Sequence, residues 1–377
     1  MRWPSLSIYQ ASALANRAFF MPRIEISLSQ IRDNARMLSA LYGRQGISLM
    51  GVSKVVLGEP AIVEALIQGG VKFIADSRLE NIQRMKNAGL AAQFVLLRTS
   101  LRQAEAIVQS VDISLNTEIA TLRELSYYAQ THNKIHHVIV MVEMGDLREG
   151  VLPGELSQFI KAALALPNIK IVGIGCNLAC YGGVKPDQIN MLHLSSLVDD
   201  LEKEFRMSLE IVSGGNSANY EWSQSAIDVG RVNNLRLGES IFLGRESVHR
   251  TAIHGLHTQA FKLVAEVIES KYKPSVPWGE SGQDAFGNVT SFPDRGIRQR
   301  SIIALGRQDV LISGLKPPAN LKILGASSDH IILDSHNYNL QVGDAVNFEL
   351  DYGGLLAAMT SPFVKKEFVN CDSYISA

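Results

Sequence analysis

The sequence predicts an α/β fold, a parallel (β/α)8 TIM barrel followed by a mostly β C-terminal domain. From residue 47 to about residue 245, short apolar runs alternate with amphipathic helical patterns, and eight such repeats are the number that closes a barrel. Beyond residue 250 no helical period dominates, and strand-like segments alternate with turns. A doubly wound open sheet is the alternative, but no Gly-x-Gly-x-x-Gly turn follows the first strand, as a dinucleotide-binding fold would require.

Hydrophobic spacing predicts the barrel elements in order. Helices are expected at 59–69 and 79–89, which both end in glycine, and at 118–132 and 187–205, which have apolar residues at helical spacing. The expected strands are short and mostly apolar: 47–53, 72–75, 93–97, 111–115, 137–143, 170–175, 209–212 and 234–237.

The chain is expected to divide into a barrel at 22–245 and a β domain at 246–377. The extended segment 22–28 could pair with the β domain, whose candidate strands are 261–270, 300–305, 322–324, 330–333 and 345–350. Residues 273–296 are rich in Gly, Pro, Ser and Asp, so a lid or interface loop is expected there. Residues 1–21 are expected to be an N-terminal appendage from a misassigned start codon, because a well-formed segment directly follows Met21.

Composition excludes several classes of function. The 36 Lys and Arg balance 37 Asp and Glu, and no basic run suggests a nucleic-acid partner. No apolar run approaches the roughly 20 residues of a membrane span. Three cysteines, an odd number and widely spaced, do not suggest a disulfide framework and fit the reducing cytoplasm.

Lys54 is the first candidate for chemistry. It follows the apolar run 47–53, which would place it at the C-terminal end of the first barrel strand, where barrel enzymes have their active sites. A lysine there could form a Schiff base with an aldehyde cofactor, which makes pyridoxal 5′-phosphate (PLP) the leading candidate. The alternative is a strand-end lysine whose ammonium simply extends into water.

Two glycine-rich turns follow the seventh and eighth expected strands. They read Ser213-Gly214-Gly215-Asn216-Ser217 and Leu235-Arg236-Leu237-Gly238-Glu239-Ser240. Such turns offer backbone N–H groups, hydroxyls and the positive end of a following helix to an anion. One such turn is often only a turn, but two at the last two strand ends favour a phosphate site at the barrel face where such sites usually lie.

With these residues in order, the chain resembles the alanine-racemase group of PLP enzymes, and within it the branch of ornithine and broad-specificity amino-acid racemases. The resemblance covers roughly residues 22–370. It implies that Lys54 is the Schiff-base lysine, that Arg236 faces the pyridine nitrogen and that Arg148 contacts the substrate carboxylate or a cofactor oxygen. It also implies that Asn177 lies against the cofactor ring, where the family has a histidine. Phosphate contacts are implied for Ser217, Gly238, Glu239 and Tyr352.

Arg236 indicates the reaction type. A guanidinium has no acceptor for a proton on the pyridine nitrogen, so the ring is a weaker electron sink than it is beside a carboxylate. A weaker sink suits removal of the Cα proton and its return to the other face, with little transamination. PLP decarboxylases on a similar barrel have glutamate at this position, so the arginine favours a racemase that interconverts L- and D-amino acids.

The second acid/base departs from the family pattern. Lys54 can serve one face of Cα, whereas alanine racemases use a tyrosine from the partner subunit for the other. Here Arg307, in Gly306-Arg307-Gln308-Asp309, replaces that tyrosine, and arginine is a poor base because it stays protonated. Either Arg307 binds the substrate carboxylate while another group takes the proton, or the chain does not racemise. The other candidate bases are Asp309, His330, His336 and Cys180.

Two further departures concern the substrate pocket. Some alanine racemases carry a modified lysine near the arginine matched by Arg148, but here the position is Met141, so no such bridge is expected to orient Arg148. Small residues at 325–328, together with the acidic Glu149, Asp309 and Asp329, weakly favour a longer cationic amino acid such as ornithine or lysine.

Two other functions on this fold stay open. A PLP-dependent β-hydroxy amino-acid aldolase would need a divalent metal, for which Asp329 with His330 and Asp334 with His336 are superficial candidates. A non-catalytic PLP-binding protein would usually lack the β domain. The resemblance implies a homodimer in which the β domain of one chain closes the barrel mouth of the other.

Overall fold

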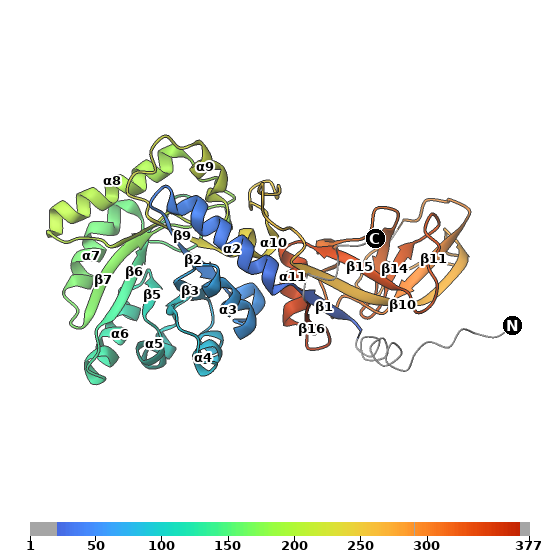
Figure 1. Ribbon diagram of the computed structural model, residues 1–377, viewed down its shortest axis with the longest axis horizontal. Helices are drawn as coiled ribbons and strands as arrows, with labels where there is room; N and C mark the ends of the chain where they lie inside the picture. The colour runs from blue at the N-terminus through green and yellow to red at the C-terminus, as the bar shows by residue number, and fades with distance from the viewer. Residues whose placement is uncertain (1–20, 290, 370–377) are drawn as a thin grey trace. The chain divides into compact units, whose positions relative to one another are not determined.

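The computed structural model describes residues 21–289 and 291–369 and divides the chain into two compact units (Figure 1). The barrel unit is Leu28–Ala260, and the β unit consists of residues 21–27 with Phe261–Val369. The sequence places the boundary at residue 245, whereas the compact units divide between Ala260 and Phe261. Apart from Met21, the predicted N-terminal appendage lies outside the described residues.

Eight parallel strands close into a barrel, which confirms the predicted fold class. Each strand pairs with its neighbours in sequence, and the last strand pairs with the first through Met50 and Arg236. All eight predicted strands occur, each within a few residues of its expected ends: β2 (Ser48–Val52), β3 (Phe73–Asp76), β4 (Gln93–Leu96), β5 (Ile113–Asn116), β6 (His136–Met141), β7 (Ile169–Gly175), β8 (Ile211–Ser213) and β9 (Asn234–Leu237).

Helices connect the strands around the barrel: α2 (Leu28–Gly43), α3 (Pro60–Gln68), α4 (Leu79–Asn87), α5 (Ala104–Ser110), α6 (Ile119–Thr131), α7 (Leu156–Leu164), α8 (Gln188–Phe205), α9 (Asn219–Ser225) and α10 (Glu239–Leu243). The four predicted helices are α3, α4, α6 and α8. Local chemistry defines their ends: Pro60 opens α3, and Asp187 with Asn190 forms a capping box at the start of α8. Gly69 ends α3 where a Cβ would come within 2.8 Å of the Arg32 carbonyl oxygen of α2.

The barrel interior is a packed apolar core. Its nine buried members come from six strands and are Met50, Val52, Ala75, Val95, Ile113, Leu115, Ile139, Met141 and Val172. Because the interior is filled, a reactive site can be built only at the ends of the strands, and the loops after their C-terminal ends are the usual place. Within residues 21–289 and 291–369, every helix is too short or too polar to cross a bilayer.

The β unit is built around one long strand, β10 (Phe261–Pro274). Its first half pairs with β15 (Ala345–Leu350) and its second half with β11 (Ile297–Ile303), with a register shift between Val267 and Glu269. The sheet continues through β14 (Ile331–Asp334) and β13 (Lys322–Ala326) on one side and ends at β12 (Leu315–Lys316) on the other. Strand β1 (Arg23–Ile26) pairs with β10 and with β16 (Lys365–Phe368), which is the pairing that the sequence left open for segment 22–28.

The β unit departs from the sequence-based expectation in two places. Helix α11 (Tyr352–Thr360) was not predicted, because its nine nearly all apolar residues have no amphipathic period. The Asp351 carboxylate caps it by accepting from the Gly354 amide at 2.8 Å. The loop expected at 273–296 begins later, since Lys273 and Pro274 belong to β10, and its described residues are mostly exposed.

A buried histidine lies at the start of β6, at the end of the barrel opposite the C-terminal strand ends. The Nε2 atom of His136 lies 2.7 Å from Oγ of Ser114, which also accepts from Nδ2 of Asn116 at 2.9 Å. Burial, assisted by the charges of His137 and Lys134, lowers the pKa of His136 from 6.5 to about 4. The histidine is therefore neutral in the folded protein at neutral pH.

This histidine should make the barrel acid-sensitive. Below pH 6.5 the unfolded chain binds a proton that folded His136 refuses, so the free energy of unfolding falls as the pH drops from 6.5 toward 4. We expect His136 to contribute about 1.4 kcal/mol per pH unit between pH 6 and pH 5. Urea titrations of wild type and His136→Gln across this range measure the contribution. Equal slopes for the two proteins would show that His136 is not the group responsible.

Candidate active site

Lys54 lies two residues beyond the end of the first barrel strand and opens a single 3-10 turn, η1 (Lys54–Val56). The preceding Ser53 is fully buried, and its Oγ donates to Oδ2 of Asp76 on the next strand at 2.7 Å. After the turn the chain reverses through two left-handed residues, Leu57 and Gly58. These contacts fix the point at which Lys54 leaves the C-terminal end of the barrel wall.

Arg236 lies on β9, the strand beside β2 in the closed barrel. Its side chain is buried, and the guanidinium donates from Nη1 to Oγ of Ser213 at 2.5 Å. Nη2 donates to the carbonyl oxygen of Cys176 at 2.8 Å and to Oδ1 of Asn177 at 3.2 Å. One cation therefore joins the ends of β7, β8 and β9 and is held in a single orientation.

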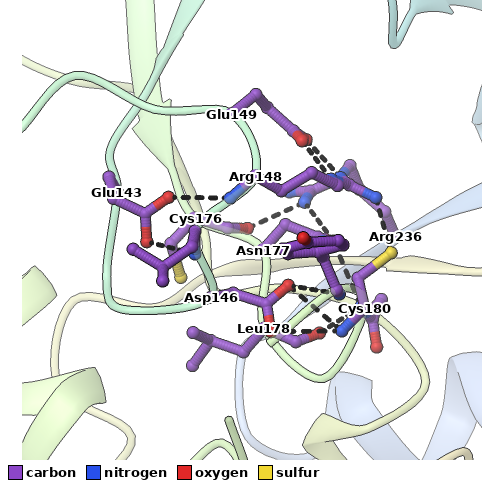
Figure 2. Close-up of polar contacts among 12 residues, drawn as sticks. Glu143, Asp146, Arg148, Glu149, Cys176, Asn177, Leu178, Cys180 and Arg236 are labelled. Atoms are coloured by element: carbon purple, nitrogen blue, oxygen red, sulfur yellow. Dashed lines mark hydrogen bonds and ion pairs between the residues drawn. The ribbon is translucent and has the colours of Figure 1, made fainter. Parts of the chain in front are cut away.

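Asn177 and Asn216 extend this hydrogen-bond network (Figure 2). Nδ2 of Asn216 donates to Oδ1 of Asn177 at 3.1 Å and to the carbonyl oxygen of Leu178 at 2.8 Å. Oδ1 of Asn177 thus accepts from both Asn216 and Arg236. Nδ2 of Asn177 is buried and has no hydrogen-bond partner among the described residues.

The two glycine-rich turns lie side by side. Oγ of Ser217, after β8, accepts from the amide of Ser240, after β9, at 3.1 Å. The two hydroxyl oxygens are also 3.1 Å apart. Gly238 directly precedes α10, and Glu239 opens that helix with its carboxylate paired to Arg250. Three of the predicted phosphate-binding residues therefore meet at one place.

Two carboxylates shape the loops that follow β6 and β7. Glu143 accepts from the amides of Gly145 at 2.6 Å and of Leu147 and Arg148 at 3.1 Å. Asp146 is buried, and its carboxylate accepts from the amide of Tyr181 at 2.9 Å and from the amides of Cys180 and Val184. The backbones that carry Arg148 and Cys180 are thus held in place by charge-assisted hydrogen bonds.

The side chain of Arg148 reaches three partner atoms at the barrel mouth (Figure 2). Its Nε and Nη2 atoms donate to the two carboxylate oxygens of Glu149, and Nη1 donates to Sγ of Cys180 at 2.6 Å. The sequence predicts that no modified lysine orients Arg148, since Met141 occupies that position. In the structure, Glu149 and Cys180 bind the guanidinium of Arg148.

The environment of the mouth favours a neutral Lys54. Burial lowers the pKa of Lys54, and the Arg148 and Arg236 guanidinium groups lower it further, while Cys180 and Glu149 act in the opposite direction. The side chain is exposed at the mouth, and the surrounding barrel loops restrict its hydration. Within the described chain, no hydrogen bond or ion pair holds the amine.

Two predicted site residues belong to the β unit. Arg307 follows β11, and its guanidinium lies 4.0 Å from the ring centre of Phe286 while Nε donates to the carbonyl oxygen of Ala326 at 3.2 Å. Tyr352 is the first residue of α11. The remaining seven predicted residues are brought together at the mouth of the barrel unit: Lys54, Arg148, Asn177, Ser217, Arg236, Gly238 and Glu239.

The candidate bases differ in their surroundings. Asp309 is buried and accepts from the Gly306 amide at 2.9 Å, and His330 places Nδ1 2.9 Å from Oδ1 of Asp329. His336 is exposed. Cys180 is the one of these four that lies in the same compact unit as Lys54. Over residues 21–289 and 291–369, no three His, Cys, Asp or Glu side chains are arranged to hold a metal.

Sequence reasoning missed the residues that hold the site in place. Ser213 and Asn216 belong to the glycine-rich turn 213–217, but nothing in the sequence pattern shows that Ser213 binds Arg236 and that Asn216 binds Asn177. Glu143 and Asp146 could have been suspected, because acidic residues in a glycine-containing loop often accept from nearby amides. The sequence shows Glu149 only as an acid next to Arg148, and its pairing with the guanidinium depends on the folded loop.

Comparison with known proteins places this geometry in a family. The model of the alanine racemase N-terminal domain matches residues 26–246. An ornithine racemase from Acetoanaerobium sticklandii is 43% identical over 354 residues, which is 92% of this chain and 99% of the relative. A lysine racemase from Thermotoga maritima is 40% identical over 352 residues, 92% of this chain and 98% of the relative.

Solved structures of alanine racemases have the same fold. The crystal structure of an alanine racemase from Bartonella henselae, which contains covalently bound pyridoxal phosphate, superposes with a TM-score of 0.71 at 20% identity, covering 92% of this chain and 99% of that one. Structural likeness at this identity supports the fold alone, whereas the two relatives above 30% identity are similar over nearly their whole length. The chain therefore belongs to the alanine racemase N-terminal domain family, and it is an amino-acid racemase.

Proposed function

We propose that the barrel mouth holds PLP on Lys54 and that the protein racemises a diamino acid, ornithine or lysine. The observation that carries the cofactor assignment is the amine of Lys54. It stands at the end of the first barrel strand without a bonding partner in the described chain, among groups that favour its neutral form. The substrate class rests on the two near-full-length relatives, an ornithine racemase and a lysine racemase.

The residues at the mouth fit this cofactor. The buried Nδ2 of Asn177 has no acceptor in the described protein, and a buried donor without a partner costs roughly 1–3 kcal/mol. An oxygen-rich ligand would complete its hydrogen bonding. The adjoining turns at Ser217 and Gly238 would hold the phosphate, and Arg236 would face the pyridine nitrogen. When bound, PLP supplies an electron-withdrawing ring that makes the Cα proton of an attached amino acid removable.

Arg236 would limit the chemistry that follows. Its Nη atoms are already bonded to Ser213, Cys176 and Asn177, and a guanidinium offers no oxygen or nitrogen acceptor. Arg236 therefore cannot hold a proton on the ligand's ring nitrogen as a carboxylate would. This favours proton removal and return at Cα over reactions that need a stronger electron sink.

Lys54 would move the proton on one face of Cα. A neutral amine accepts a proton and the resulting ammonium returns one, and a lowered pKa increases the share of the neutral form that can act as the base. The proton on the other face is moved by a second group, and we propose that Arg307 assists Arg148 in binding the substrate carboxylate, because its guanidinium is stacked on Phe286 and stays protonated. This role follows the resemblance, in which the β domain of a second chain completes the site of a homodimer.

Racemase activity can be tested by proton exchange at Cα. We expect protein supplied with PLP to replace the α-proton of L-ornithine and L-lysine by deuterium in deuterated water, with both enantiomers accumulating. Lys54→Ala should lose at least a hundredfold of this rate, since general acid–base groups contribute about 10²–10⁴-fold. NMR and chiral chromatography follow the two events. A wild-type protein that exchanges no α-proton in any amino acid would overturn the proposal.

The state of Lys54 can be tested without the cofactor. Only the neutral amine reacts with acetic anhydride, so the acylation rate of Lys54 should rise with pH and reach half its maximum below the ordinary lysine pKa of 10.5. Peptide mass spectrometry after competitive labelling measures this rate against free Nα-acetyl-lysine. A midpoint at or above 10.5 would contradict the lowered pKa and remove one support for Lys54 as a base.

A further inference from the structure

The three carboxylates on the loop after β6 are used in different ways. Among the described loop residues 142–150, Glu143 and Asp146 accept from backbone amides, so they organise the chain. Glu149 instead directs both carboxylate oxygens to the guanidinium of Arg148. Its side chain is 34% exposed, so a molecule that enters the mouth can reach it. Glu149 is therefore placed to contact a ligand, whereas the other two are committed to the loops.

Glu149 also interacts with two other basic side chains of the mouth. Its charge interacts with Lys54 and with Arg236 as well as with Arg148. Figure 2 shows its carboxylate beside Arg148, with Arg236 behind. Two guanidinium groups and the Lys54 amine thus interact with one carboxylate of this loop. A substrate carboxylate that enters the mouth would compete with Glu149 for them.

Glu149 and Cys180 occupy three of the five N–H donors of Arg148. Nε and Nη2 bind Glu149, and Nη1 binds Cys180. A carboxylate that binds an arginine through two parallel hydrogen bonds must take one edge of the guanidinium, and the edge held by Glu149 is the one suited to it. The exchange releases Glu149, and a partly buried carboxylate that loses its cation is destabilised unless a new one replaces it.

We propose that Glu149 exchanges Arg148 for the side-chain ammonium of the substrate and so selects diamino acids. This inference rests on the proposed function and adds the residue that determines specificity. A substrate such as ornithine carries both charges that the exchange needs, a carboxylate for Arg148 and a distant ammonium for Glu149. Norvaline has the same carbon chain without the ammonium, so it releases Glu149 and leaves it without a partner.

The test compares these two amino acids in variants of Glu149. In Glu149→Gln, the ratio of kcat/KM for ornithine to that for norvaline should fall about tenfold or more, mainly through KM for ornithine, while norvaline turnover is kept or raised. Glu149→Asp, which retains the charge, should keep part of the preference. Glu155→Gln removes one charge from an exposed residue of the next turn, η3 (Pro153–Glu155), and should leave the ratio unchanged.

A binding measurement separates selection from positioning. α-Methylornithine and α-methylnorvaline have no α-proton, so calorimetry reports their Kd values without turnover, and Glu149→Gln should lower the preference by a similar factor. If both substrates slow equally and the binding ratio is unchanged, Glu149 only orients Arg148 and the inference is overturned. If wild type processes norvaline as fast as ornithine, the inference also fails but racemase function stands. If wild type exchanges no amino acid at all, both fail.

Discussion

The barrel mouth depends on one buried cation, Arg236. Removing a guanidinium from water costs several kcal/mol, and charge-assisted hydrogen bonds of about 1.5–3 kcal/mol each must offset that cost. Ser213, Cys176 and Asn177 provide these bonds from two neighbouring strand ends. Gly175 leaves space beside Ser213, because a Cβ at that position would come within 3.0 Å of Cβ and of the carbonyl oxygen of Ser213. The charge that limits the proposed chemistry thus also fixes the strand ends that form the site.

Charge balance connects this cation to the rest of the mouth. Arg236, Arg148 and Lys54 are close enough to influence one another, and burial lowers the pKa of both Lys54 and Arg236. Cationic neighbours keep the lysine ready to lose its proton, which a base needs. The carboxylate of Glu149 keeps the same cluster from being too positive in the absence of substrate. In the proposed scheme, one set of charges therefore serves both proton transfer and the recognition of a diamino acid.

The barrel was predictable from the sequence because its signals are local. Each strand is a short apolar run bounded by polar or glycine residues, as in 47–53 before Lys54. Eight such runs, separated by helical patterns, are typical of a (β/α)8 barrel. Helix α11 was missed because its apolar residues have no period and its cap, Asp351, gives a weak signal. The pairing of β1 with β10 joins residues more than 200 positions apart, and no local pattern specifies such a contact.

The candidate site was predictable only as a set of residue types. Lys54, Ser217 and Arg236 follow strand ends, and the topology of a barrel brings strand ends together. Their hydrogen-bond partners depend on how loops fold back, as Asp146 shows by binding amides more than 30 residues away. Glu143 fixes the loop backbone by accepting from its amides, including that of Arg148, and so brings Arg148 to Glu149. No spacing rule in the sequence reveals this pairing.

The most direct test of the account is to locate the cofactor chemically. The purified protein is incubated with PLP, reduced with borohydride, digested and mapped by mass spectrometry. The account predicts one dominant pyridoxyl adduct, on the peptide that contains Lys54, formed at PLP concentrations that leave other lysines unmodified. An adduct spread over exposed lysines, or a dominant adduct elsewhere in the chain, would contradict the assignment of the barrel mouth as the PLP site.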